Sequence, residues 1–164
     1  MTAQTKKISK GVLAGVAGGL FAAFVMDRFQ HLASKLQVAK PAPEEGEPAT
    51  VKAASAIARS ALNHDLTPEE KKAAGPVMHY LMGGLSGGIY GAVSAIAPNA
   101  ANKGAGTLFG AAVWLLADEL AVPAFGLAKQ PAEVPASQHG MALLAHLVYG
   151  LATWGARRAL LTVA

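Results

Sequence analysis

The stretch Pro76–Ala97 reads PVMHYLMGGLSGGIYGAVSAIA and contains no Asp, Glu, Lys or Arg, while glycine occupies positions 83, 84, 87, 88 and 91. A helix of a soluble bundle needs a polar face, and each interior glycine costs about 1 kcal/mol relative to alanine in water. In a bilayer, glycine instead lets helix backbones approach one another closely. The stretch therefore predicts a membrane-spanning helix.

Three further apolar stretches have the same character, so we expect four spans at roughly 10–30, 76–97, 104–123 and 139–158. The 164-residue chain is 52% hydrophobic and only 15% charged, with a mean hydropathy of +0.34, whereas soluble domains carry about 25% charged residues. The prediction is an all-α polytopic membrane protein, 1–164 as one membrane domain, with its four transmembrane helices in an antiparallel bundle. The alternative, a soluble four-helix bundle, conflicts with the uncharged second stretch.

Glycine recurs every four residues in three of the predicted spans, which places it along one ridge of each helix. We expect these ridges to pack the helices inside the bundle, or to dock another copy of the chain or a membrane-protein partner. The ridge residues are Gly11, Gly15 and Gly19, then Gly83, Gly87 and Gly91, then Gly106 and Gly110.

The polar segment 31–75 is predicted to be an extracytoplasmic loop. Residues 40–48 are rich in proline and glutamate and resemble an extended linker. Val51, Ala54, Ala58 and Leu62 share one face of a short amphipathic helix that could lie on the membrane surface. The sequence Thr67-Pro68-Glu69-Glu70 then predicts a helix start with a capping box.

The charges predict an orientation. If both termini lie on one side, that side has six basic and no acidic residues, a net charge of +6, and the other side has eight basic and ten acidic residues, −2. Basic residues near short flanks mark the cytoplasmic side, so we expect both termini in the cytoplasm. No small-residue cleavage site follows the first apolar stretch, which we therefore interpret as an uncleaved span. The scattered basic residues favour the lipid bilayer, and not nucleic acid, as the partner.

Titratable residues gather at the span ends that face away from the termini. Ionisable groups in spans usually face the interior of a bundle, and three interpretations remain open: satisfied polar caps, a proton-responsive site, or a metal or haem site. The chain has no cysteine and no His-Glu-x-x-His or Glu-x-x-His motif, so we expect no cofactor. The candidate residues are His79, Asp118, Glu119 and His146, with His139, Asp27 and His31 nearby.

The second half of the chain carries several short motifs in a fixed order. Asp118 follows a glycine-bearing span and precedes Val122-Pro123 and Phe125-Gly126-Leu127, after which come Ala145-His146-Leu147-Val148 and the basic pair Arg157-Arg158. This arrangement resembles the YagU-like family of small bacterial inner-membrane proteins. The resemblance implies four spans in the bacterial inner (plasma) membrane, although members can have histidine where this chain has Asp118, and their first loop differs. The family has no agreed activity, so the resemblance implies no reaction.

From these patterns we expect a non-enzymatic membrane protein that responds to external pH through its histidine–carboxylate cluster or assembles with partners. A channel or transporter component would use the same groups as a gate or relay. A metal-binding membrane protein is the third alternative.

Overall fold

The computed structural model describes residues 1–36 and 46–163, and every regular element in these ranges is a helix. Three long helices dominate: α1 (Ala3–Lys35), α3 (Pro68–Ile96) and α6 (Ala136–Val163). A fourth rod is built from α4 (Lys103–Val113), the π-helical segment η2 (Trp114–Ala121) and α5 (Val122–Ala124). The shorter elements are α2 (Ala49–Leu62) and the 3-10 turns η1 (Pro98–Ala101) and η3 (Pro131–Glu133). The all-α prediction is confirmed.

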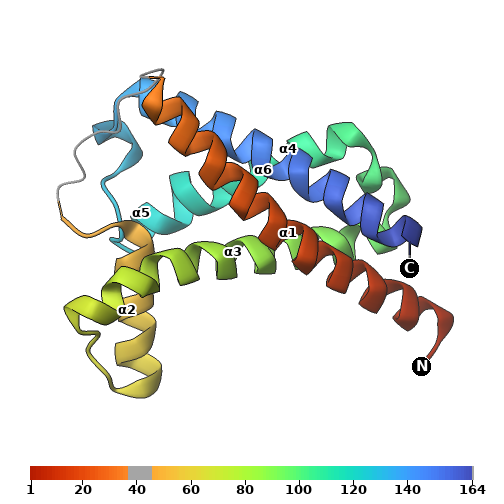
Figure 1. Cartoon of the computed structure of the whole chain (residues 1–164), viewed down its shortest axis with the longest axis horizontal. Helices are drawn as coiled ribbons and strands as arrows, with labels where there is room; N and C mark the ends of the chain where they lie inside the picture. The colour runs from red at the N-terminus through yellow and green to blue at the C-terminus, as the bar shows by residue number, and fades with distance from the viewer. Residues whose placement is uncertain (37–45, 164) are drawn as a thin grey trace.

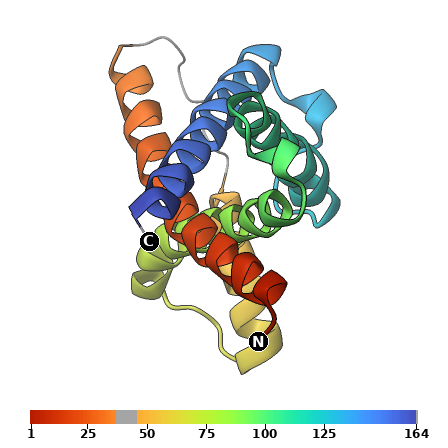
Figure 2. The ribbon, with the colours of Figure 1, turned by 90° about the vertical axis from the view of Figure 1, so that its right-hand side faces the viewer.

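The four rods are antiparallel neighbours (Figure 1). α1 packs against both α3 and α6, and α4 packs against α6, so that α6 lies between α1 and α4 in Figure 2. Both chain ends lie at one end of the bundle, and α2 lies at the other. This arrangement brings the end of α1, the start of α3, η2 and the start of α6 to the same end.

The closest helix contact is the crossing of α1 and α3, where glycine faces glycine. A Cβ atom at Gly87 would lie 2.7 Å from the Cα of Gly19 and would overlap the carbonyl oxygen of Gly15. Gly11 meets Gly91, and Gly19 meets Gly83, in the same way. Because the obstructing atoms are backbone atoms, which cannot move aside as a side chain can, only glycine allows this approach.

Two more close contacts at glycine join the remaining helices. On α4, a Cβ at Gly110 would overlap the carbonyl oxygen of His146, and one at Gly106 would lie 2.6 Å from the Cβ of Trp154. On α1, a Cβ at Gly18 would lie 3.1 Å from the carbonyl oxygen of Thr153. Gly18 lies outside the ridge that the four-residue spacing predicts, and it shows that α1 uses two of its faces.

The side-chain distribution is reversed relative to a soluble bundle. The buried core consists mostly of glycine and alanine, and its large members are Met26, Met78, Tyr90, Tyr149, His146 and Arg157. Large aliphatic and aromatic side chains instead cover the outer faces of all four rods, Leu108 being 72% and Ile89 65% exposed, together with Leu13, Phe21, Leu85, Leu116, Leu120 and Leu151. Exposed apolar surface of this extent marks contact with lipid or protein.

Two of the helical rods are long and apolar enough, by length and composition alone, to cross a membrane. They are Ala3–Lys35, with a mean hydropathy of 1.7 in its most apolar part, and Gly104–Ala124, with 1.4. These two correspond to the first and third predicted spans. The many glycines of α3, together with its histidine and tyrosines, lower its mean hydropathy.

The predicted amphipathic helix in the first loop is present as α2. Val51 and Ala58 are buried, and α2 packs on α3, where a Cβ at Gly75 would lie 3.0 Å from Val51 Cγ2. The Lys52 ammonium donates a hydrogen bond to the carbonyl oxygen of Leu127 (3.1 Å). α2 therefore joins the start of α3 to the segment that follows α5.

The predicted capping box at the start of α3 is confirmed. The Glu70 amide donates to Thr67 Oγ1 (3.3 Å), and the Thr67 amide donates to Glu70 Oε2 (2.7 Å). Pro68 occupies the first helical turn, where its missing N–H leaves no bond unmade.

We predict that Gly87→Ala lowers the apparent free energy of unfolding by about 1–3 kcal/mol, because the added methyl must displace the α1 backbone. Reversible denaturation of the purified protein in mixed detergent–SDS micelles measures the change. Gly155→Ala is the matched control on α6, because a Cβ there meets nothing within 4 Å, and we expect it to stay within about 0.5 kcal/mol of wild type. Equal stability of the two variants would contradict close α1–α3 packing.

We predict that the stability of the first turn of α3 depends on pH. The hydrogen bond from the Thr67 amide, and after it the bond to His64, lowers the pKa of the Glu70 carboxyl below its ordinary value of 4.5. The stabilisation that the ionised Glu70 carboxylate gives to this helix turn is therefore present above pH 4.5, and it is lost as the pH falls through the lowered pKa. Hydrogen exchange of the first-turn amides should show this loss in wild type. Glu70→Gln keeps an acceptor for Thr67 but does not titrate, so persistent pH dependence in that variant would contradict the assignment.

Candidate polar site inside the helical bundle

The π-helical segment η2 positions the two acidic candidates of the fourth rod. The amide of Val122 donates to the carbonyl of Ala117, five residues back, instead of four. Pro123 follows directly, and its missing N–H removes the bond that an α-helix would make to the carbonyl of Glu119. Short π-helical segments are frequent at functional sites. This one carries Asp118 and Glu119 and places them beside the start of α6.

A cavity of about 430 Å³ lies between α1, α3, η2 and α6. Its polar lining includes His79, Asp118, His146 and Tyr149, and Met26, Met82 and Val113 contribute apolar walls. The Tyr149 hydroxyl donates a hydrogen bond to the carbonyl oxygen of Gly83 (2.6 Å), which ties α6 to α3. Three of the predicted titratable residues therefore line one internal space.

Asp118 and His146 face each other across η2 and α6 without a short hydrogen bond. His146 Nδ1 lies 3.6 Å from Asp118 Oδ2 but 2.9 Å from the carbonyl oxygen of Ala142. A carbonyl oxygen can only accept, so Nδ1 carries a proton and donates it to Ala142. The Asp118 carboxylate therefore remains without a donor among the described side chains.

Glu119 and His139 form the tightest of the histidine–carboxylate pairs. His139 Nδ1 lies 2.6 Å from Glu119 Oε1, and His139 Nε2 lies 3.0 Å from the carbonyl oxygen of Pro131. The carbonyl accepts only, so Nε2 carries a proton, and a second proton must lie between Nδ1 and the carboxylate. Loss of that second proton would leave two lone pairs facing each other, so this contact requires a bound proton.

The third pair joins α1 to α3. Asp27 Oδ1 lies 3.2 Å from His79 Nε2, and Asp27 Oδ2 accepts a hydrogen bond from the Tyr80 hydroxyl (2.9 Å). The i, i+4 spacing of Asp27 and His31 does not bring them into one site, because His31 is exposed while Asp27 faces α3.

The candidates thus form three pairs that each bridge two elements, and not one compact cluster. Among the described residues, no group of three or more His, Asp or Glu side chains lies close enough to hold a metal ion. Sequence reasoning missed Tyr80, Tyr149 and the accepting carbonyls of Pro131 and Ala142. Pro123, five residues after Asp118, was the one available signal for the π-helical segment.

We predict that Tyr149→Phe lowers the apparent free energy of unfolding in mixed micelles by about 1 kcal/mol, because it removes the buried bond to Gly83. Thr162→Val is the comparison, since the exposed Thr162 hydroxyl bonds only within its own helix, to Ala159. If Tyr149→Phe destabilised the protein no more than Thr162→Val, the hydroxyl would not contribute to holding α6 against α3.

Comparison with known proteins provides no relative for this chain. No family model matches it, nor does a curated protein or a solved structure. The resemblance to the YagU-like family remains a prediction from the motifs of 106–158, and the site is interpreted from its own geometry.

Proposed function

We propose that the chain is a four-span, non-enzymatic membrane protein of the bacterial inner membrane that changes its helix packing in response to protons. The single observation that carries the proton response is the position of His139 between two acceptors, Glu119 and the Pro131 carbonyl. This geometry holds only while the pair keeps its proton. The pair bridges η2 and the start of α6, so its protonation state controls how two rods meet.

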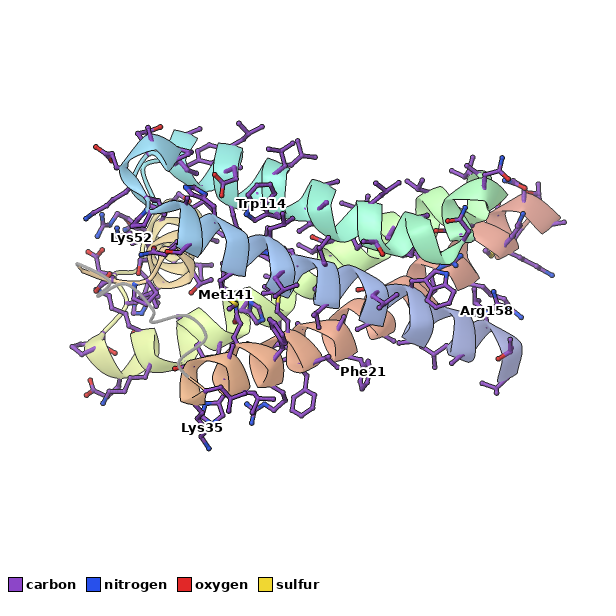
Figure 3. All side chains as sticks on the ribbon, turned by 90° about the horizontal axis from the view of Figure 1, so that it is seen from above. Phe21, Lys35, Lys52, Trp114, Met141 and Arg158 are labelled. Carbon is purple, nitrogen blue, oxygen red and sulfur yellow. The ribbon has the colours of Figure 1, made fainter. Side chains whose placement is uncertain are left out.

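The large apolar side chains on the outer faces of the bundle support the membrane assignment. Lipid is the environment in which exposed leucine and phenylalanine side chains and a glycine core are both favourable. Phe21 lies on the outer face of the bundle in Figure 3. α3 and α6 have 29 and 28 residues, which at about 1.5 Å per residue exceeds the roughly 30 Å of a hydrocarbon core. Four spans are therefore our proposal, although only two rods are apolar enough by composition alone.

The charge distribution supports the proposed orientation. Arg158 lies at one end of the bundle, with both termini, and Lys35 and Lys52 lie at the other (Figure 3). The terminal end has the basic residues near short flanks, which favours the cytoplasm. In this orientation the three histidine–carboxylate pairs lie in the extracytoplasmic half of the bundle, where they can respond to external pH.

A channel or transporter component is the second candidate, favoured by the internal cavity of about 430 Å³. The cavity brings His79, Asp118 and His146 to one space between the helices, as a relay or gate would require. A metal-binding protein is the weaker alternative, because the described candidates form pairs and metal sites usually need three or more ligands.

The proton response is tested by Trp114 emission in lipid nanodiscs, in a Trp154→Phe background that leaves one reporter. We predict an emission change as rising pH removes the shared proton. We expect this change to be lost in Glu119→Gln, which removes the carboxylate that shares the proton with His139. His31→Ala is the matched control, because His31 is exposed on α1, and its titration should equal that of wild type.

An unchanged titration in Glu119→Gln would contradict the proton response. A polypeptide that stays monodisperse in buffer without detergent would contradict the membrane assignment itself.

A further inference from the structure

Asp118 lies in the wall between two adjoining cavities. The outer cavity, about 550 Å³, is bounded by α2, α3, the η2–α5 segment and the start of α6. It shares Ala49, Thr50, Met82, Ala117, Asp118 and Val122 with the inner cavity of about 430 Å³. Both volumes lie within the range of small-molecule sites, about 300–1,000 Å³. A ligand in the outer cavity can therefore reach the Asp118 carboxylate.

The outer cavity is lined mainly by apolar side chains, two of them methionine. Met78 and Met82 come from α3, Ile57 from α2, and Val122, Phe125 and Leu127 from the segment around α5. Methionine adapts to varied apolar shapes. The described lining of the inner cavity includes no Lys or Arg, and Lys129, which lines the outer cavity, has an interaction of its own. The outer cavity is lined by two carboxylates, Asp118 and Glu119. Because Glu119 is paired with His139, the apolar walls and the Asp118 carboxylate favour a ligand that is hydrophobic and positively charged.

The two neighbouring carboxylates differ in their availability. Glu119 is bonded to His139, and its side chain is only 14% exposed. The Asp118 side chain is 41% exposed, and its nearest titratable partner, His146, donates its Nδ1 proton to Ala142. A cationic ligand would give Asp118 a permanent positive charge, whereas the His146 ring, 3.6 Å away, is charged only when both of its nitrogens carry a proton.

We propose that the outer cavity binds a hydrophobic monocation, an organic amine or onium ion, with its charge against Asp118 and its apolar groups against Met78, Met82 and Val122. This inference rests on the proposed membrane setting and adds a second proton-sensitive group to it, because a proton and the cation would compete for the Asp118 carboxylate, whereas the proposed proton response is carried by His139 and Glu119. The titratable and charged groups that face or adjoin Asp118 are His146 on α6, His79 on α3 with Asp27 behind it, and Glu119 on η2, with His139 and Lys129 lining the same cavity.

The experiment measures binding of tetraphenylphosphonium to the full-length protein in non-ionic detergent by equilibrium dialysis, with empty micelles as the blank. We expect saturable binding at pH 8 that weakens at pH 5.5, and affinity at least about tenfold lower for Asp118→Asn. Tetraphenylborate has nearly the same shape and the opposite charge, so it should not bind saturably. Asp65→Asn is the matched control, because the exposed Asp65 lines neither of these two cavities, and it should bind the cation as wild type does.

Met82→Trp is the second variant, and it keeps Asp118. Its larger side chain should fill the space at the wall between the cavities, so we expect it to abolish saturable binding as well. Helix content and gel filtration show whether each variant is folded. Equal binding of the phosphonium and the borate, or unchanged affinity in folded Asp118→Asn, would overturn the cation site. The Trp114 titration is made without ligand, so a normal titration with no cation binding would overturn this inference alone.

Discussion

The absence of side chains where α1 crosses α3 is the constraint on which the remaining structure depends. Gly15 and Gly19 meet Gly83, Gly87 and Gly91 at distances that any Cβ would prohibit. This approach aligns the end of α1 with the start of α3, and so brings Asp27 to His79 and Tyr80. Glycine in mid-helix is unfavourable in water but favourable where a close contact between backbones replaces contact with lipid. In the proposed membrane setting, the same residues therefore serve both the packing and the environment.

Because small residues occupy the centre of the bundle, most of the large apolar residues lie on its outside. A soluble protein of this composition would bury its leucine and phenylalanine side chains, but here they cover the outer faces of the four rods. The histidine–carboxylate pairs lie at one end, between helices, and the buried Arg157 lies against the Tyr90 ring toward the other end. A bundle built in this way gains stability from dispersion contacts and a few buried hydrogen bonds, such as that from Tyr149 to Gly83. Changes in those few polar bonds can therefore shift how the helices meet.

The sequence was sufficient to place the helices and insufficient to pair the side chains. Hydrophobic runs and the Thr67–Glu70 motif depend on local chemistry, so the helix positions and the capping box could be predicted. The candidate residues were gathered at the correct end because antiparallel order alone determines that. Their partners could not be predicted, because the rotation of each helix depends on contacts between distant segments. Asp27 turns toward α3 and away from His31 for this reason, and Gly18 joins α1 to α6 outside the four-residue pattern.

The π-helical segment separates the roles of two adjacent carboxylates. Sequence alone treats Asp118 and Glu119 as equivalent, yet Glu119 is held by His139 while Asp118 opens into the cavities. The Pro131 carbonyl contributes to this difference, because it accepts a hydrogen bond from His139 Nε2–H. The contact between His139 Nδ1 and Glu119 then needs a second proton. The Ala142 carbonyl has a different effect at His146, since it accepts the hydrogen bond from Nδ1–H that Asp118 could otherwise accept. Two backbone acceptors thus make one pair depend on a proton and leave the other carboxylate available for an external cation.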